Sequence, residues 1–186
     1  MADTNKGKLI ALSAPSGAGK STICKHLLER NPDFRLSISA TTRAPRFSEK
    51  DGVDYFFLDT ADFLARAKRG EFLEFEEVHG NYYGTLRSTI EQFLDEGKTV
   101  LLDIDVNGAL NIKQNFPTAL LIFIKPPSIE ALKTRLRNRK TETSESIERR
   151  LQRLPLEYTK GESFDVQVIN DDLQQTIIEI ERLIRS

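Results

Sequence analysis

A glycine-containing segment near the N-terminus, Ala14–Thr22, constrains the fold of this chain more than any other feature. It differs at one position from the P-loop pattern G-x-x-x-x-G-K-[ST], because Ala14 stands where the pattern has its first glycine. An apolar stretch, Leu9–Leu12, precedes it, and a segment typical of a helix, Ile23–Arg30, follows it. A strand, a glycine loop and a helix in this order form a cradle for phosphate. The segment therefore predicts binding of a nucleoside triphosphate; the alternative is a glycine-rich turn that arose by chance.

The residues of this loop have expected roles. Gly17 and Gly19 carry no Cβ, so consecutive backbone N–H groups can turn toward a phosphate. Lys20 is expected to reach the β- and γ-phosphates, and the Ser21 hydroxyl is expected to ligate Mg²⁺. The methyl group of Ala14 is compatible with this function, because its position serves the turn from strand to loop more than contact with phosphate.

Composition limits the other functions of the chain. Its 186 residues suffice for one well-packed α/β domain, and a net charge of −1 argues against a nucleic-acid-binding surface over the whole protein. The lone cysteine, Cys24, is expected in the core, and two distant histidines do not indicate a zinc site. Neither a signal peptide nor a membrane-spanning run is evident. The sequence predicts a soluble cytoplasmic protein without nucleic-acid or membrane partners, and it does not indicate an oligomeric state.

Four nearly continuous apolar segments are expected to form buried parallel strands, since helices then cover both faces of the sheet. They are Leu9–Ala14, Thr99–Ile104, Ala119–Ile124 and Val166–Ile169. Helices are expected over Leu86–Glu96, capped by Thr85 and ended by Gly97, over Ile129–Arg139, capped by Ser128, and over Leu173–Ile184. The alternation predicts an α/β fold with a P-loop-type parallel sheet wrapped by helices.

The region Phe34–Gly84 interrupts this alternation. Leu36–Ser39, Tyr55–Leu58 and Phe72–His79 are expected as antiparallel strands with one polar face, and Ala61–Arg69 is expected as a short helix between them. A small mixed α/β insertion directly after the P-loop helix is a suitable place for an acceptor substrate.

Two segments of this insertion carry residues suited to phosphate. Arg43 and Arg46 lie in a loop stiffened by proline, and guanidinium groups match phosphate oxygens in pairs. The alternative for this pair is a solvated basic turn. Tyr82 and Tyr83 lie in an expected turn flanked by glycines, and the alternative for them is packing against the insertion.

Asp103 and Asp105 end a predicted strand of the parallel sheet. An acidic residue at the carboxyl end of a strand beside the P-loop is placed to hold Mg²⁺ directly or through water, and this is the favoured interpretation of Asp103. For Asp105, a cap of the next helix and a contact with substrate are both open.

Basic residues gather after the middle of the chain. They are Arg135, Arg137, Arg139, Lys140, Arg149 and Arg150. One interpretation is a favourable interaction of these charges with a helix C-terminus. The other is a lid whose arginines close on a transferring phosphoryl group and exclude water. The P-loop favours the lid.

Taken in order, these segments resemble the guanylate kinase family. The resemblance rests on Ser-Ala-Pro-Ser-Gly-Ala-Gly-Lys-Ser, Ser-Ala-Thr-Thr-Arg-Ala-Pro-Arg, Asp-Tyr-Phe-Phe, Gly-Asn-Tyr-Tyr-Gly-Thr, Leu-Asp-Ile-Asp and Val-Ile-Asn-Asp-Asp, and it runs from Lys8 to the C-terminus. It implies the reaction of ATP with GMP to give ADP and GDP, with Mg²⁺ as cofactor. It also implies one domain over 1–186, with a core (8–33, 86–125 and 160–186), a GMP-binding lobe (34–85) and a helical lid (about 135–150).

The resemblance assigns roles residue by residue. The ATP-binding residues it implies are Ser16, Gly17, Ala18, Gly19, Lys20, Ser21, Thr22 and, for adenine, Asn170. Those for the GMP phosphate are Arg43, Arg46, Tyr55 and Tyr83, and those for guanine are Ser39, Glu74, Thr85 and Asp105. The implied catalytic residues are Lys20, Arg43, Arg135, Arg139 and Arg150, and the implied metal ligands are Ser21 and Asp103.

The chemistry of guanine agrees with these assignments. An ionised Glu74 accepts from N1–H and the 2-amino group, whereas adenine offers it a lone pair, and hydroxyl groups can donate to O6. None of the named contacts uses the 2′-hydroxyl, so dGMP is an expected substrate as well. The chain departs from the family pattern at Asn138 and Lys140, which flank Arg139 in place of glycines, and at Asn107, which replaces a common glutamine.

Two other functions are compatible with parts of this pattern. One is a guanylate-kinase-like scaffold domain that binds phosphopeptides without catalysis, but such domains typically lack an intact P-loop, and this chain keeps Lys20 and Ser21. The other is a P-loop kinase for a different phosphorylated acceptor, against which Glu74 and two hydroxyl groups suited to O6 argue.

Overall fold

The computed structural model describes residues 6–78, 80–138 and 144–186. The strands in these ranges form a five-stranded parallel sheet in the order β2-β7-β1-β8-β9 and a four-stranded mixed sheet in the order β4-β3-β6-β5. The strands are β1 (Lys8–Ser13), β2 (Phe34–Leu36), β3 (Ala40–Thr41), β4 (Phe56–Phe57), β5 (Phe72–Val78), β6 (Asn81–Leu86), β7 (Thr99–Asp103), β8 (Leu120–Lys125) and β9 (Val166–Ile169).

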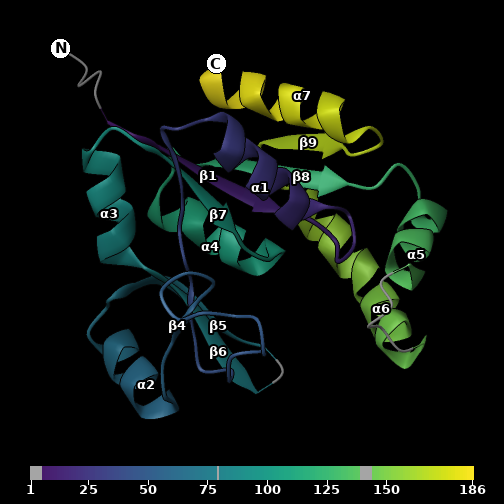
Figure 1. Cartoon of the computed structure of the whole chain (residues 1–186). Coiled ribbons are helices and arrows are strands. Elements are labelled where there is room, and N and C mark those ends of the chain that lie inside the picture. The colour runs from purple at the N-terminus through teal and green to yellow at the C-terminus, as the bar shows by residue number, and fades with distance from the viewer. Residues whose placement is uncertain (1–5, 79, 139–143) are drawn as a thin grey trace.

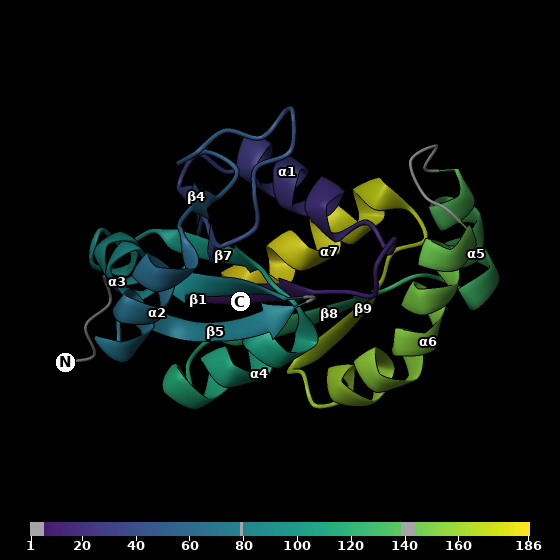
Figure 2. The same ribbon diagram turned by 90° about the horizontal axis from the view of Figure 1, so that it is seen from below.

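Helices follow most strands of the parallel sheet, as Figure 1 shows. Those in the described ranges are α1 (Lys20–Arg30), α2 (Thr60–Lys68), α3 (Arg87–Asp95), α4 (Val106–Asn115), α5 (Ile129–Arg137), α6 (Ser144–Gly161) and α7 (Leu173–Arg185). In Figure 2, α1 and α7 lie on one side of the parallel sheet and α4 lies on the other. The sheet is therefore covered on both faces.

The two faces of β1 explain why its sequence is apolar without interruption. Leu9 and Ala11 belong to a core cluster with residues of α3 and α4, whereas Ile10 and Leu12 belong to a second cluster with residues of α1 and α7. Side chains of a strand alternate between faces, so a strand covered on both needs apolar residues throughout. The predicted α/β fold and its four buried parallel strands are confirmed, with strand ends within one residue of the prediction.

The mixed sheet and α2 form a small lobe at one end of the parallel sheet (Figure 1). Phe63 of α2 is fully buried and stacks on Phe72 of β5 with ring centroids 4.4 Å apart. Ala40 of β3 completes the small core of the lobe. This lobe is the predicted insertion, and the structure gives it a core of its own.

The structure corrects the prediction in the lobe at several places. Leu36–Ser39 is not an antiparallel strand: β2 pairs in parallel with β7, so residues 34–36 belong to the main sheet. β4 is likewise parallel to β3. Tyr82 and Tyr83 lie within β6 rather than in a turn, because this segment pairs with both β5 and β3. Thr85 does not cap α3, since Leu86 holds the N-cap position and no side chain caps the helix.

Two helices, α5 and α6, lie beside one another at the other end of the molecule from α2 (Figure 2). Leu132 and Leu136 of α5 pack against Leu154 of α6. The predicted cap of α5 is confirmed, because the Ser128 hydroxyl accepts a hydrogen bond of 3.0 Å from the backbone N–H of Ala131. Within the described ranges, no helix has the length and apolar character needed to span a membrane.

Candidate active site

The P-loop connects β1 to α1 and depends on its two inner glycines. Gly17 has φ 93° and Gly19 has φ 101°, in the left-handed region that side chains rarely adopt. A Cβ on Gly17 would lie 2.8 Å from the Leu136 side chain, and one on Gly19 would lie 2.5 Å from Asn170 Nδ2. Gly19 is the N-cap of α1 and has no side chain that could cap the helix. The backbone N–H groups in the first turn of α1 therefore remain available to an anion. Ala14 packs against the adjoining core cluster, which explains its methyl group.

Asp103 lies beside the P-loop, where the sequence places it. Its Oδ1 is 2.6 Å from Lys20 Nζ, and its Oδ2 accepts a 3.0 Å hydrogen bond from the Ser21 hydroxyl. The cause is the sheet register, because β1 and β7 are parallel neighbours and Leu12 pairs with Asp103. Lys20 also donates to the carbonyl oxygen of Ile104 at 2.8 Å. Lysine, hydroxyl and carboxylate thus converge at one edge of the sheet.

Asn170 and Arg135 hold the P-loop in position through hydrogen bonds. Asn170 is 5% exposed, and its Nδ2 donates to the Ala18 carbonyl oxygen at 2.7 Å. Arg135 Nη2 donates to the backbone oxygen of Asn170 at 2.9 Å, and Nη1 lies 3.5 Å from the Ala18 carbonyl oxygen. Both side chains therefore hold the P-loop in position, a structural role that sequence reasoning did not anticipate. Contact of Asn170 with adenine stays a prediction.

The helix α6 also reaches the P-loop. Arg150 donates a hydrogen bond to the Ser16 hydroxyl. Thr22 lies exposed in the first turn of α1. Arg139 and Lys140 of the predicted lid lie outside the described residues.

A cavity of about 410 Å³ lies in front of the P-loop and receives one acidic residue from α6, Glu157. Burial raises the pKa of the Glu157 carboxyl, although positive charges on Arg153, Lys20 and Arg150 act in the opposite direction. Glu157 was missing from the predicted site. The sequence does contain a signal for it: Glu157 lies seven residues after Arg150, so the two residues share a face of the helix.

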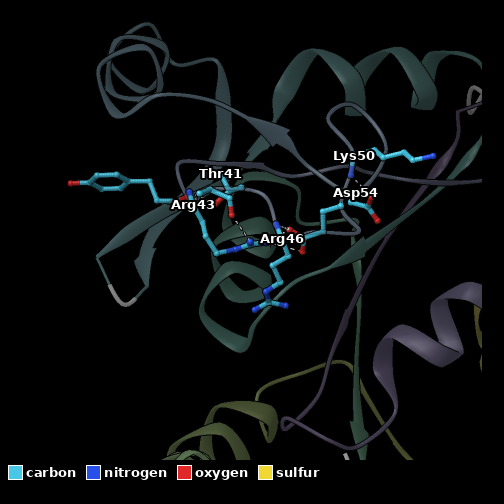
Figure 3. Close-up of polar contacts among 8 residues, drawn as sticks. Thr41, Arg43, Arg46, Lys50 and Asp54 are labelled. Atoms are coloured by element: carbon cyan, nitrogen blue, oxygen red, sulfur yellow. Dashed lines mark hydrogen bonds and ion pairs between the residues drawn. The ribbon is translucent and has the colours of Figure 1, made fainter. Parts of the chain in front are cut away.

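The two arginines of the predicted phosphate clamp share one carboxylate, Glu49 (Figure 3 shows the loop that carries them). Arg43 Nη2 lies 2.9 Å from each oxygen of Glu49, and the backbone N–H of Arg46 donates to Oε2 at 2.8 Å. The N–H of Arg46 and then the Arg43 guanidinium hold the pKa of Glu49 below its usual value. Sequence reasoning missed Glu49, although its partners are local in the sequence: it lies six residues after Arg43 and three after Arg46.

Tyr55 lies against both the clamp and β6. The Arg43 guanidinium lies 5.4 Å from the centre of the Tyr55 ring, and the rings of Tyr55 and Tyr83 are 6.2 Å apart. Burial raises the pKa of Tyr55. The structure therefore brings Arg43, Tyr55 and Tyr83 together, as expected for a phosphate site, while Arg46 stays exposed on the loop.

A second cavity, of about 210 Å³, is lined by Ser39, Glu74 and Asp105, three of the four residues predicted to recognise guanine, and the fourth, Thr85, is fully buried and does not line it. Glu74 Oε1 accepts a 2.6 Å hydrogen bond from the buried hydroxyl of Thr85. Burial raises the pKa of Glu74 to about 7, and the Thr85 hydrogen bond acts against this rise.

Of the two roles left open for Asp105, the structure confirms the helix cap, and contact with substrate stays a prediction. Its Oδ1 accepts a 2.8 Å hydrogen bond from the backbone N–H of Gly108, so it is the N-cap of α4. It also lines both cavities. The helix N-terminus thus fixes a carboxylate at the place where the two cavities meet.

The fold and this cleft define a P-loop nucleotide-binding protein in which a second cavity adjoins the loop. The family model described as guanylate kinase matches residues 6–186. The chain belongs to the guanylate kinase family.

Guanylate kinases from several bacteria resemble the chain over nearly its whole length. The guanylate kinase of Clostridium perfringens (strain 13) is 47% identical over 180 residues, which are 97% of this chain and 83% of that protein. That of Synechocystis sp. is 49% identical over 179 residues, or 96% and 94% of the two chains. The crystal structure of guanylate kinase from Anaplasma phagocytophilum has a TM-score of 0.80 at 35% identity and covers 97% of this chain and 86% of that one. The chain is accordingly an ATP:GMP phosphotransferase.

Proposed function

We propose that ATP and GMP bind side by side in the two cavities and that the phosphoryl group passes between them by in-line displacement. One observation carries this proposal. The two cavities are contiguous, because the same residues line both. They are Ser39, Tyr55, Asp103, Ile104 and Asp105. A γ-phosphate on the P-loop and a monophosphate at Arg43 would meet at this shared wall.

On the GMP side, the arginine clamp binds the phosphate and the second cavity binds the base. Arg43, Arg46, Tyr55 and Tyr83 bind the phosphate. Glu74 accepts from guanine N1–H and the 2-amino group, and Asp105 assists at the amino edge. Thr85 and Ser39 lie on the side of O6. Support comes from the placement of Glu74, whose carboxylate is buried in the cavity and oriented by Thr85.

On the ATP side, Ser16 to Thr22 surround the phosphates, and Asn170 serves the adenine side. Mg²⁺ fits this site, because Ser21 and Asp103 offer hard oxygen ligands to one point beside the loop and substrate phosphates complete such sites in proteins. When bound, the ion neutralises charge on the phosphates. Lys20 and Asp103 form an ion pair at 2.6 Å, so the ammonium group is already aimed at this point.

Catalysis in this proposal needs no covalent intermediate. The GMP phosphate attacks the γ-phosphorus of ATP, and the protein contributes position and positive charge. Lys20, Arg43, Arg135 and Arg150 supply that charge from the described residues, and Arg139 supplies it from outside them. A cytoplasmic location also stays a prediction, which fractionation of cells would test.

The test is an ADP-release assay with Mg·ATP and a panel of GMP, dGMP, AMP, CMP and UMP. At a pH above about 8, where Glu74 is ionised, we expect turnover with GMP and dGMP, and turnover lower by about a hundredfold with AMP, because a buried carboxylate left facing a lone pair costs on the order of a few kcal/mol. Equal use of AMP and GMP would refute the assignment of Glu74. Loss of activity with dGMP would show that a residue outside the named set binds the 2′-hydroxyl.

A further inference from the structure

A third carboxylate, Glu76, lines the base cavity beside the two assigned to guanine. Glu74 and Glu76 are two residues apart on β5, so their side chains leave the same face of the strand. Phe75 and Glu77, which alternate with them, are exposed. The sequence predicted a polar face for this strand but gave Glu76 no role.

Residues from two other elements hold Glu76 in place. Asn107 of α4 donates from Nδ2 to Glu76 Oε1 at 2.7 Å, and Lys160 of α6 donates to Asn107 Oδ1. The side chain is therefore fixed through one oxygen. The other oxygen, Oε2, is buried, and no described residue donates a hydrogen bond to it. A buried carboxylate oxygen without a donor costs free energy, so it marks a place where a ligand N–H group would be stabilised.

The position of Glu76 identifies the edge of the base that it faces. The two oxygens of Glu74 point to different sides of the cavity: Oε1 accepts from Thr85, whereas a Cβ placed on Gly108 would lie 3.1 Å from Oε2. In the proposed pose of GMP, O6 lies on the side of Thr85, so the side of Gly108 is that of the 2-amino group. Asn107, which binds Glu76, directly precedes Gly108, so Glu76 is held on the amino side.

We propose that Glu76 is a further specificity-determining residue, which accepts a hydrogen bond from the 2-amino group of guanine, and that Asn107 and Lys160 position it. This inference rests on the proposed place of GMP. The 2-amino group carries two hydrogen atoms, of which Glu74 takes one, so the other is left for the carboxylates on the amino side, where Glu76 lines the cavity together with Asp105. Burial and the neighbouring Asp105 carboxyl raise the pKa of Glu76, whereas the hydrogen bond from Asn107 and the charge of Lys160 act against this rise and favour the ionised acceptor. The described residues contain no group of three or more acidic, histidine or cysteine side chains that could hold a metal ion, so a cation site does not explain this cluster.

The test compares GMP with IMP, which keeps O6 and N1–H but lacks the 2-amino group. In Glu76→Gln, we expect the ratio of kcat/KM for GMP to that for IMP to fall about tenfold or more, through GMP alone, since a hydrogen bond to a charged group is lost. The phosphate is common to both nucleotides, so the change in net charge cancels in the ratio. Glu77→Gln, on the exposed face of the same strand, is the matched control and leaves the ratio unchanged.

Two further variants make the result decisive. Asn107→Ala, which releases Oε1 of Glu76, is expected to lower the same ratio by a smaller factor, and it serves if Glu76→Gln does not fold. An unchanged ratio in Glu76→Gln, or an equal loss with GMP and IMP, would overturn the proposal. Glu74→Gln distinguishes failure of the proposed binding place of GMP from failure of the proposed role of Glu76. If this variant leaves the preference for GMP over AMP unchanged, the place of GMP is wrong. If it erodes that preference while Glu76→Gln has no effect, only the role of Glu76 is lost.

Discussion

Glu74 shows how one buried side chain can link recognition to pH. Its carboxylate must be ionised to accept from N1–H of guanine, yet burial raises its pKa to about 7 in the free protein. A protonated Glu74 can instead donate to N1 of adenine. The state of a single proton therefore decides which purine matches the cavity.

This leads to a prediction about specificity. The ratio of kcat/KM for GMP to that for AMP should rise as pH increases from about 6 to 8, because ionised Glu74 favours guanine and disfavours adenine. The phosphates of the two nucleotides titrate alike, so they cancel in the ratio. In Glu74→Gln the ratio should be small and flat over this range. A flat profile in the unsubstituted protein would show that Glu74 keeps one protonation state throughout.

Other residues of the site were beyond sequence reasoning for a common reason. Glu76 and Glu157 lie near residues that the chain brings close only by folding. Asn107 is 31 residues from Glu76, and 53 residues separate it from Lys160. The P-loop residues were predictable because strand, loop and helix are consecutive, so local geometry alone places their side chains.

At the scale of elements, the predictable strands were those with two buried faces. β1 and β7 each carry a continuous apolar run, and a short run of this kind is typical of a strand that is buried on both faces. β2 has only the sequence Phe-Arg-Leu, and it joins the main sheet because β7 offers a free edge for parallel pairing. β6 follows Gly80 and contains Gly84, so its sequence resembles a turn, yet pairing on both sides makes it a strand. Pairing between distant segments, rather than propensity, decided these elements.

The P-loop itself gives a prediction about Asn170. Its amide donates to Ala18 O at 2.7 Å, so Asn170→Ala should loosen the loop and weaken phosphate binding, with KM for ATP raised roughly tenfold and GMP binding little changed. Binding of inorganic triphosphate, which has no adenine, separates the two roles of this residue. If Asn170 supports the loop, triphosphate binding falls as well; if it contacts only adenine, triphosphate binding is unchanged. Asp171→Asn, at the exposed neighbouring position, is the control.

The whole molecule assembles its site from three parts that are distant in sequence. The carboxyl ends of β1 and β7 supply the P-loop and Asp103, the lobe supplies Glu74 and the arginine clamp, and α6 supplies Arg150 and Lys160. Ligands of open α/β sheets bind at this end of the strands. Concentrating carboxylates there has a cost for the stability of the entire fold.

That cost is measurable as a pH dependence of unfolding. Because the folded pKa of Glu74 is about 7, above the value of 4.5 for a free glutamate, its contribution to stability is complete below about pH 4.5 and is lost as pH rises to about 7. Glu74→Gln removes this loss. Relative to the unsubstituted protein, the variant should gain about 2 to 3 kcal/mol in free energy of unfolding between pH 5 and pH 8. Urea titrations at the two pH values would measure it, and an equal difference at both would disprove the link.

The ion pair between Arg43 and Glu49 has a consequence for the rate at which nucleotide is captured. Arginine loses about 2 kcal/mol of rotamer entropy when it is immobilised, and here that loss occurs when the chain folds rather than when the ligand arrives. Nη2 of the guanidinium contacts Glu49 and Nη1 donates to the Ala44 carbonyl oxygen at 2.7 Å, so two of its nitrogens are held in place. The binding site for the monophosphate is thus preorganised, so an encounter with the nucleotide can lead to binding without a prior rearrangement of Arg43.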